Sequence, residues 1–313
     1  MEIMNPSSRN ANPMYPSVFA MRFMPQRLTQ SIDWHGHLCF AAWLLELTKP
    51  SSIVELGVFR GDSLSTFAQA SRELGISPAI MGVDTWAGDE TTGKYTEEVY
   101  ADLKDYFDAN HPAVRLFRGF FDDALLTVPM GSVDVLHIDG SHIYEDVKHD
   151  YETWLPKMSE RGVILFHDIA VENGNFGTKR FWDEICQHFP SFKFDHSNGL
   201  GVLFCGPSQP EVLRRIAEDR AHCEAVKAVF ELTGAKFFHL AKEKYWKRET
   251  DKHAAYASHI SSGLGEAIGQ SAAAQISAFI ASSEIQSALT STAQKRNFLH
   301  RAISALVRKL RLH

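Results

Sequence analysis

The chain has 313 residues, of which 44% are hydrophobic and 22% are charged, as is ordinary for a soluble globular protein. This length leaves room for one large domain and an appendage. The formal net charge of −6 gives no overall attraction for nucleic acid, so we expect no nucleic-acid partner. No apolar run approaches the roughly 20 residues that span a bilayer.

The N-terminus and the cysteines both favour a cytoplasmic protein. Residues 1–16 are polar, contain proline and lack the apolar stretch of a secretory signal. The cysteines form no C-x-x-C pair, and they are widely spaced at Cys39, Cys186, Cys205 and Cys223. This pattern favours reduced thiols in the cytoplasm.

Strands and helices alternate after a short N-terminal part. We expect residues 1–30 to be a flexible lead-in and residues 33–50 to form a helix with Asp33 as its N-cap. The predicted strands cover, in chain order, residues 51–57, 79–86, 114–119, 133–139 and 162–168. The predicted helices cover 62–75, part of 87–112, 122–129, 144–161 and 178–190. Such alternation is typical of an α/β fold with a parallel sheet.

Residues 191–205 add a different kind of connection. Two β-rich runs are joined here by Asn198-Gly199, which is the strongest short hairpin signal. The last two strands are therefore predicted to be antiparallel to each other. A mostly parallel sheet that ends in such a hairpin differs from the all-parallel sheet that binds dinucleotides.

The composition changes after residue 207. Charged helical patterns continue to about residue 255, and residues 261–293 are rich in serine and alanine. In the tail, a helical apolar stripe is surrounded by arginine and lysine over residues 295–313. We therefore expect a domain over 31–206 and a helical extension over 207–313. The basic tail could pack on the domain or on a second copy in a homo-oligomer, or it could contact an anionic membrane surface or a partner protein.

Two predicted strands end in aspartate and histidine, at HIDGSH (137–142) and LFHDI (165–169). The helix between them makes a βαβ unit, so the two strands are predicted to be parallel. Their carboxyl ends then bring four side chains to one crevice, namely Asp139, His142, His167 and Asp168. Ligands bind at this edge in open α/β sheets, so the sequence predicts an enzyme.

A glycine turn follows the first strand in VELGVFRGDSL. Gly57 and Gly61 allow the backbone to pass close to a ligand, although they could instead serve only helix–strand packing. The helix that begins near Ser63 offers free N–H groups to a carboxylate. The spacing G-x-x-x-G differs from the G-x-G-x-x-G fingerprint of dinucleotide sites.

Three further residues complete the predicted ligand pocket. Glu55 is expected to accept from the ammonium group of a bound amino-acid moiety. Asp84 ends the next strand, where a carboxylate can take both hydroxyls of a ribose. Trp86 follows and is expected either to border the adenine or to be part of the core.

At this point the motifs ELGVFRGDS, VDTWAGDE, HIDGSHIYEDV and GVILFHDI can be compared with known families. They resemble class I S-adenosylmethionine (SAM) methyltransferases, more narrowly the subgroup with metal-dependent macrolide-sugar O-methyltransferases, over roughly residues 33–206. The resemblance implies a Rossmann-like seven-stranded sheet, SAM as cofactor, and a hydroxyl of a sugar, glycoconjugate or small natural product as acceptor.

The same resemblance implies roles at the strand ends. Asp139 would bind a divalent metal such as Mg²⁺, and His142 would be the general base. The acids that close the next strand in the subgroup correspond to His167 and Asp168 as further metal ligands, and His167 departs from that pattern. A cation would lower the pKa of a bound hydroxyl, and a histidine near its ordinary pKa could take the proton.

Other interpretations of these residues remain open. Asp139 could bind only the SAM ammonium in a metal-independent enzyme, and His142 could be a helix cap. His167 could orient Asp168 without ligating a metal. Further alternatives are a metal site at His142, Asp146 and His149, a core role for His137, and a core or acceptor-pocket role for Trp182. A SAM-binding scaffold without catalysis, recruiting partners through the tail, is the alternative from another functional class.

Overall fold

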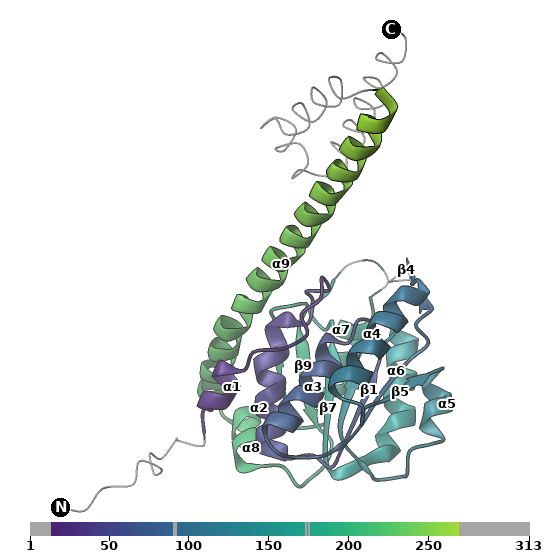
Figure 1. The fold of residues 1–313 in the computed structure, drawn as a ribbon. Helices are drawn as coiled ribbons and strands as arrows, with labels where there is room; N and C mark the ends of the chain where they lie inside the picture. Colours follow the sequence, from purple (N-terminus) through teal and green to yellow (C-terminus); the bar gives the residue numbers. More distant parts are fainter. Residues whose placement is uncertain (1–13, 90–92, 173, 175, 269–313) are drawn as a thin grey trace, which may run out of the picture. The chain divides into compact units, whose positions relative to one another are not determined.

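The computed structural model describes residues 14–89, 93–172, 174 and 176–268 (Figure 1). The start of the predicted lead-in and the basic tail at 295–313 therefore lie outside the described residues. By packing, the chain divides into a compact unit that ends at Ala241 and a second unit from Lys242 onward. Within the described residues, no helix combines the length and the apolar character that a membrane span needs.

A seven-stranded sheet forms the centre of the first unit, with the order β5-β2-β1-β6-β7-β9-β8. The strands are β1 Ser52–Leu56, β2 Ala79–Asp84, β5 Arg115–Arg118, β6 Val133–Ile138, β7 Met158–His167, β8 Ser191–Phe194 and β9 Leu200–Phe204. The pairs among β5, β2, β1, β6 and β7 are parallel, whereas β9 is antiparallel to both of its neighbours. This confirms the predicted fold class.

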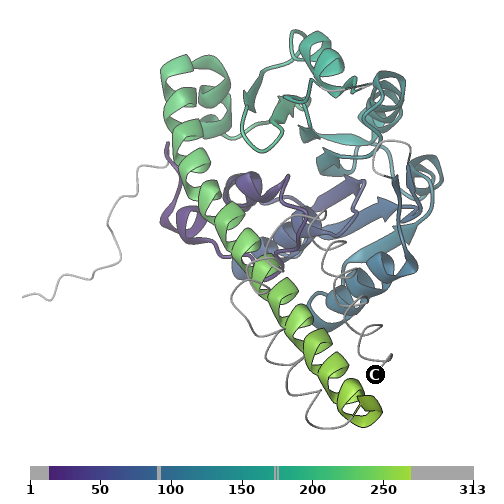
Figure 2. The same cartoon turned by 90° about the horizontal axis from the view of Figure 1, so that it is seen from above.

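Helices cover both faces of the sheet (Figures 1 and 2). One face carries α2 Leu38–Thr48, α3 Asp62–Glu73 and α4 Glu97–Asn110, and the other carries α5 Phe121–Leu125, α6 Tyr144–Trp154 and α7 Thr178–Ile185. Alternate residues of each strand enter the two cores, as when Leu165 faces the first helix layer and Phe166 the second. Strands buried on both faces explain the unbroken apolar runs in the sequence.

The hairpin forms at the predicted place with a longer loop than Asn198-Gly199 alone. Five residues, 195–199, separate β8 from β9. Ser197, Asn198 and Gly199 adopt positive φ values of 49°, 63° and 87° in succession. Asparagine and glycine adopt positive φ more readily than most residues, which explains why they suit positions 198 and 199 of this loop.

The chain before the first strand differs from the expectation in two respects. Asp33 does not cap a helix, because a 3₁₀ turn at His35–His37 comes first and α2 begins only at Leu38. Residues within the predicted lead-in also pack on the domain, since α1 (Val18–Arg22) buries Ala20, and Phe23 joins the same core. A small two-stranded sheet, β3 Gly88–Asp89 with β4 Gly93–Lys94, was not predicted.

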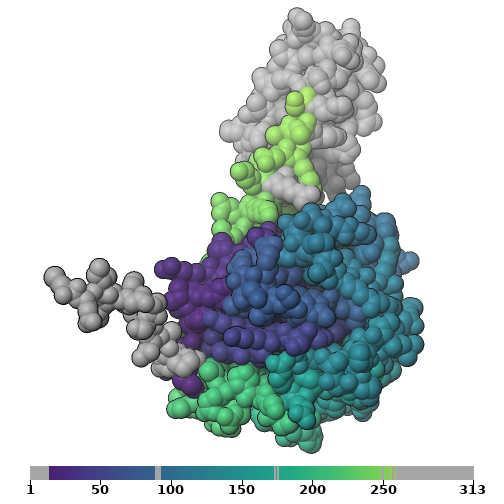
Figure 3. Space-filling view, turned by 60° about the horizontal axis from the view of Figure 1, so that its bottom comes forward, coloured from purple at the N-terminus to yellow at the C-terminus, as the bar shows by residue number. Residues whose placement is uncertain are grey.

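The compact unit extends past residue 206 into the C-terminal helices. α8 spans Glu211–Glu218 and α9 spans Arg220–Ile268. Apolar side chains of both helices enter the core beside α2, including Val226, Phe230 and Phe237 of α9. The N-terminal segment borders this part of the chain (Figure 3). Tyr15 packs on His222, and Lys236 donates to the Met21 carbonyl. Residues 207–241 thus pack with the sheet, which composition alone did not indicate.

Candidate functional site

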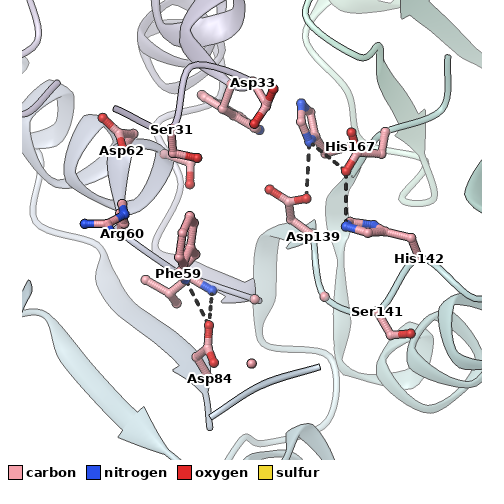
Figure 4. A pocket seen from close by; sticks show the side chains of 18 of the residues that line it. Ser31, Asp33, Phe59, Arg60, Asp62, Asp84, Asp139, Ser141, His142 and His167 are labelled. Carbon is pink, nitrogen blue, oxygen red and sulfur yellow. Dashed lines mark hydrogen bonds and ion pairs between the residues drawn. The ribbon is translucent and has the colours of Figure 1, made fainter. Parts of the chain in front are cut away.

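A cavity of about 830 Å³ lies at the carboxyl ends of β1, β2, β6 and β7 (Figure 4). The strand ends, the start of α3, the segment before the 3₁₀ turn and the loop around Phe176 form its walls. Of the residues predicted for the site, those that line it are Gly57, Gly61, Ser63, Asp84, Asp139, His142, His167 and Asp168. The topology of parallel strands therefore brings most of the predicted set together.

Gly57 is required by the close approach of two strand ends. Its φ is +85°, and a Cβ at this position would lie 2.0 Å from the carbonyl oxygen of Asp139. The Asp139 N–H donates to the Leu56 carbonyl at 2.8 Å, which holds the ends of β1 and β6 together. Any side chain here would push Asp139 out of place, so this glycine joins the turn to the strand-end cluster.

Asp84 organises the same turn from the end of β2. One carboxylate oxygen accepts from the N–H groups of Val58 and Phe59, each at 2.9 Å, and the other accepts from the Trp86 N–H at 2.6 Å. The Asp84 carboxylate therefore faces the cavity with a fixed orientation. Carboxylate oxygens retain further lone pairs, which suits the predicted contact with ribose hydroxyls.

Two of the residues predicted to bind the cofactor do not line the cavity. Glu55 is fully buried, and it accepts from the Ser63 hydroxyl at 2.9 Å and from His137 Nδ1 at 3.1 Å. Burial raises the pKa of Glu55, although His137 and Ser63 oppose the shift. Trp86 is also buried, and its indole N–H donates to the Phe59 carbonyl at 3.0 Å. Both side chains therefore hold residues of the glycine turn and the helix start, Phe59 and Ser63, and do not face the cavity.

His137 is a satisfied buried histidine. The Trp34 indole N–H donates to its Nε2 at 3.0 Å, so Nε2 carries no proton and Nδ1 donates to Glu55. The predicted alternative of a core role for His137 agrees with this arrangement. Through the bond to His137, the indole of Trp34 is fixed at the wall of the cavity.

Two acids and two histidines meet at the ends of β6 and β7. His142 Nε2 lies 3.3 Å from Asp168 Oδ2. His167 Nδ1 lies 3.2 Å from Asp139 Oδ1 and 3.5 Å from Asp168 Oδ2, so this imidazole bridges the two carboxylates. Asp168 has a φ of 60°, which is uncommon outside glycine and marks a locally strained site.

The charges in this cluster stabilise one another. Burial by itself would lower the pKa of His167, but the carboxylates of Asp139 and Asp168 outweigh it and hold that pKa well above its ordinary value. Burial likewise opposes ionisation of Asp139, yet the charge of His167 and its hydrogen bond lower the pKa of Asp139 to about 2. Both ring nitrogens of His167 face acceptors, since Nε2 lies 3.1 Å from the Ser197 carbonyl oxygen. A protonated His167 is the state that this geometry favours.

The donor set also fits a divalent cation. Ligand atoms of Asp139, His142 and Asp168 all lie within 4.8 Å of one another. Asp168 Oδ1 is buried without a hydrogen-bond partner, so one carboxylate oxygen is free for a ligand. Two carboxylates and an imidazole are common ligands of divalent metals. His167 lies beside this set and contacts both of its acids.

The alternative metal site at His142, Asp146 and His149 does not form, although Asp146 also lines the cavity. His149 pairs with Asp122 at 3.0 Å, and Asp146 accepts from the Ser141 hydroxyl at 2.6 Å, so His142, Asp146 and His149 do not converge on one point. Trp182 is buried in the core and does not line the cavity.

The sequence did not identify the wall formed by Ser31, Asp33 and Trp34. This segment is held over α3, because the carboxylate of Asp62 accepts from both the N–H and the hydroxyl of Thr29. The segment has no periodic pattern, and its contacts are distant in sequence. Phe176, which stacks on His142 with ring centroids 4.6 Å apart, was also missed.

Residues 54–169 match a family model described as a methyltransferase domain. These residues are a methyltransferase domain. The match covers the strand ends that carry Asp84, Asp139 and Asp168, and therefore the parts of the fold that build the cavity.

Two curated relatives are similar to this chain, and one of them is named as an O-methyltransferase. The chain is 38% identical to an uncharacterised protein of Sinorhizobium fredii over 219 residues. This match covers 70% of this chain and 24% of that protein. The chain is also 27% identical, over 144 residues, to a tetracenomycin-C 4′-O-methyltransferase of Streptomyces olivaceus that is named for a dimethoxy-rhamnosyl substrate. This match covers 39% of this chain and 54% of that protein. The chain thus spans between about a quarter and about half of the length of these curated relatives.

A solved structure is also similar to the methyltransferase domain. An SAH-bound methyltransferase of Podospora anserina aligns with a TM-score of 0.41 and 14% identity, over 56% of this chain and 88% of that one. The strand order, rather than this similarity, identifies the fold.

Proposed function

We propose that this protein is a SAM-dependent O-methyltransferase that acts on a hydroxyl of a sugar, glycoconjugate or small natural product. The charge of the cavity carries the proposal. Among the described residues, Arg60 is the one lysine or arginine that lines the cavity. Six aspartates line it, namely Asp33, Asp62, Asp84, Asp139, Asp146 and Asp168. SAM carries a sulfonium and an ammonium group, so it suits this anionic cavity, whereas the phosphates of a dinucleotide would be repelled.

The proposed cofactor contacts follow the glycine turn. Asp84 would accept from the ribose hydroxyls, and the N–H groups at the start of α3 would take the methionine carboxylate. No side chain caps this helix start at Gly61, which supports the second contact. Glu55 would act indirectly, by holding the Ser63 hydroxyl and His137. Asp139 remains available to the ammonium group in a metal-independent form of the enzyme.

His142 is the proposed general base. If its Nε2–H donates to Asp168 Oδ2, the other ring nitrogen keeps a lone pair for the proton of the acceptor hydroxyl. The methyl group then passes from sulfur to oxygen, the C–S bond breaks, and S-adenosylhomocysteine leaves with the electron pair. Asp168 would orient the base and stabilise the imidazolium that forms.

A divalent cation is the proposed assistant in this step. Asp139 and Asp168 would hold it, and a bound cation would take the place of the Nδ1 proton of His167, which would then be the further ligand that the sequence predicted. His142 would stay free as the base. When bound, such a cation supplies Lewis-acid activation of the hydroxyl. The relative named for a rhamnosyl substrate supports the acceptor class, and the four free cysteines support a cytoplasmic location.

Transfer from methyl-labelled SAM to a panel of glycosides and glycosylated natural products tests the proposal. The expected result is labelled product on at least one acceptor, with turnover lost in chelator and restored by Mg²⁺ or Mn²⁺. Turnover that resists chelator would favour the metal-independent form. SAM binding by calorimetry without transfer to any acceptor would favour the non-catalytic scaffold.

A further inference from the structure

Three segments of the chain pack closely together behind the active-site cluster, at positions where two glycines leave no space for a side chain of their own. Gly234 lies in α9, Gly36 in the 3₁₀ turn, and Ser197 in the β8–β9 loop. A Cβ on Gly234 would lie 2.2 Å from the carbonyl oxygen of Gly36, and a Cβ on Gly36 would lie 2.2 Å from the Ser197 hydroxyl oxygen. A helix, a turn and a loop from distant parts of the chain are therefore in direct contact.

Polar contacts hold the same three segments together. His196 Nε2 donates to the Gly36 carbonyl at 3.2 Å, which fixes the loop against the turn. Lys227 of α9 lies 3.4 Å from the Asp195 carboxylate, so the helix also binds the start of the loop. Ser197 keeps a positive φ of 49° in this arrangement. The loop geometry thus depends on both neighbours.

The loop in turn contacts the catalytic cluster through one carbonyl. The Ser197 oxygen accepts from His167 Nε2 at 3.1 Å and from His37 Nε2 at 3.2 Å. A carbonyl can only accept, so His167 donates from Nε2 and directs Nδ1 toward Asp139 and Asp168. An outer hydrogen bond of this kind fixes the ring orientation of a histidine in an active site.

We propose that Gly234 is a positioning residue of the active site. Through Gly36, α9 sets the place of the Ser197 carbonyl and thereby the orientation of His167 between the two carboxylates. This inference rests on the proposed function, and it gives the C-terminal extension a role in catalysis. Glycine is, after proline, the poorest helix former, so its place inside α9 indicates that close packing requires it.

Gly234→Ala tests this role without weakening the helix, because alanine is the better helix former. The added methyl group displaces the Gly36 backbone and hence the Ser197 carbonyl. We expect kcat to fall at least about tenfold, as small misplacements of catalytic groups do. The KM for SAM is expected to change less than about twofold, because no cofactor contact moves. Ala235→Ser is the matched control, since it adds one atom at the neighbouring exposed position and is expected to leave kcat unchanged.

A second substitution separates positioning from general damage. Ser197→Gly removes the side chain beside Gly36, keeps the carbonyl and suits the positive φ. In the double variant we expect most of the kcat to return. Wild-type kcat in Gly234→Ala would overturn the proposal, and so would a loss of kcat that Ser197→Gly does not relieve.

A readout without turnover keeps this test independent of the proposed reaction. In the cofactor-free protein labelled with ¹⁵N-histidine, the Nε2 resonances of His37 and His167 are expected to shift in Gly234→Ala and to return in the double variant. Unchanged resonances would refute the positioning role even if the enzyme is active. Shifted resonances in a protein that transfers no methyl group would keep the positioning role and reject the proposed reaction.

Discussion

At the scale of single residues, the Asp84 carboxylate has two roles that mutation would affect together. It holds the turn through the N–H groups of Val58, Phe59 and Trp86, and in the proposed function it binds the ribose. Each contact is a hydrogen bond to a charged group, which is worth about 1.5–3 kcal/mol. The residue is therefore where cofactor affinity and local structure are coupled.

For Asp84→Asn we expect the Kd for SAM to rise by about tenfold to a hundredfold, because the amide replaces one acceptor by a donor. Calorimetry with SAM measures this change in Kd.

His142→Asn is the contrasting variant, and it is expected to keep SAM affinity while kcat falls at least about a hundredfold. If Asp84→Asn keeps its affinity and His142→Asn loses it, the two roles are exchanged.

Asp150 is a buried acid outside the proposed chemistry. Its exposed fraction is 6%, and burial raises its pKa to about 7, with Asp146 and Asp122 adding to the shift and His149 opposing it. The unfolded chain loses this proton near pH 4. Between about pH 4 and 7 the folded state therefore binds more of this proton than the unfolded state does. The contribution of Asp150 to the free energy of unfolding thus falls as pH rises from about 4 to 7 and is constant above about pH 7.

Asp150→Asn cannot ionise and is expected to avoid this loss. Its melting temperature should exceed that of the wild type at pH 8 and approach it at pH 4.5, with a free-energy difference of at most about 4 kcal/mol. Thermal melts across that pH range measure it, with the exposed Asp105→Asn as control. The same difference in melting temperature at both pH values would show that Asp150 does not titrate as described.

At the scale of elements, the glycine turn after β1 depends on the approach of β6. Gly57→Ala would place a methyl group 2.0 Å from the Asp139 carbonyl oxygen, whereas the Cβ of Gly75→Ala would meet nothing within 4 Å. Both positions have a positive φ, +85° and +67°, so backbone strain is similar in the two variants. Comparison of the pair isolates the steric contact.

We therefore expect Gly57→Ala to lose SAM binding and to unfold at a temperature several degrees lower than Gly75→Ala does. Calorimetry and circular dichroism measure the two effects. Equal behaviour of the two variants would show that the contact between the ends of β1 and β6 is not what requires glycine.

Strand ends were predictable from the sequence because their position follows from local pattern. Apolar runs that stop at Asp84, Asp139 and Asp168 indicate buried strands, and parallel connections bring their ends to one edge. The wall formed by Ser31, Asp33 and Trp34 was not predictable, because the Trp34–His137 bond joins residues 103 positions apart. The partners of Glu55 are likewise fixed by packing that periodicity does not encode.

At the scale of the whole molecule, residues 207–241 of the appendage belong to the compact unit that holds the cavity. Apolar side chains of α8 and α9 are buried beside α2, and only the 3₁₀ turn separates α2 from the wall segment. The two ends of the described compact unit therefore meet on the face of the sheet that carries α2 to α4. Removing the C-terminal helices is expected to affect folding before it affects chemistry.

Truncation tests where the folding unit ends. A chain that ends at Ala241 keeps every side chain of the compact unit, so we expect it to unfold cooperatively near the full-length melting temperature and to bind SAM. A chain that ends at Gly206 loses the buried side chains of Val212, Leu213, Ile216, Val226, Phe230 and Phe237. Their burial is worth on the order of 10 kcal/mol, which is comparable to the whole stability of a domain, so we expect no cooperative transition. Full stability in the shorter chain would restore the boundary at 206 that composition predicted and would remove the structural basis for a role of α9 in the active site.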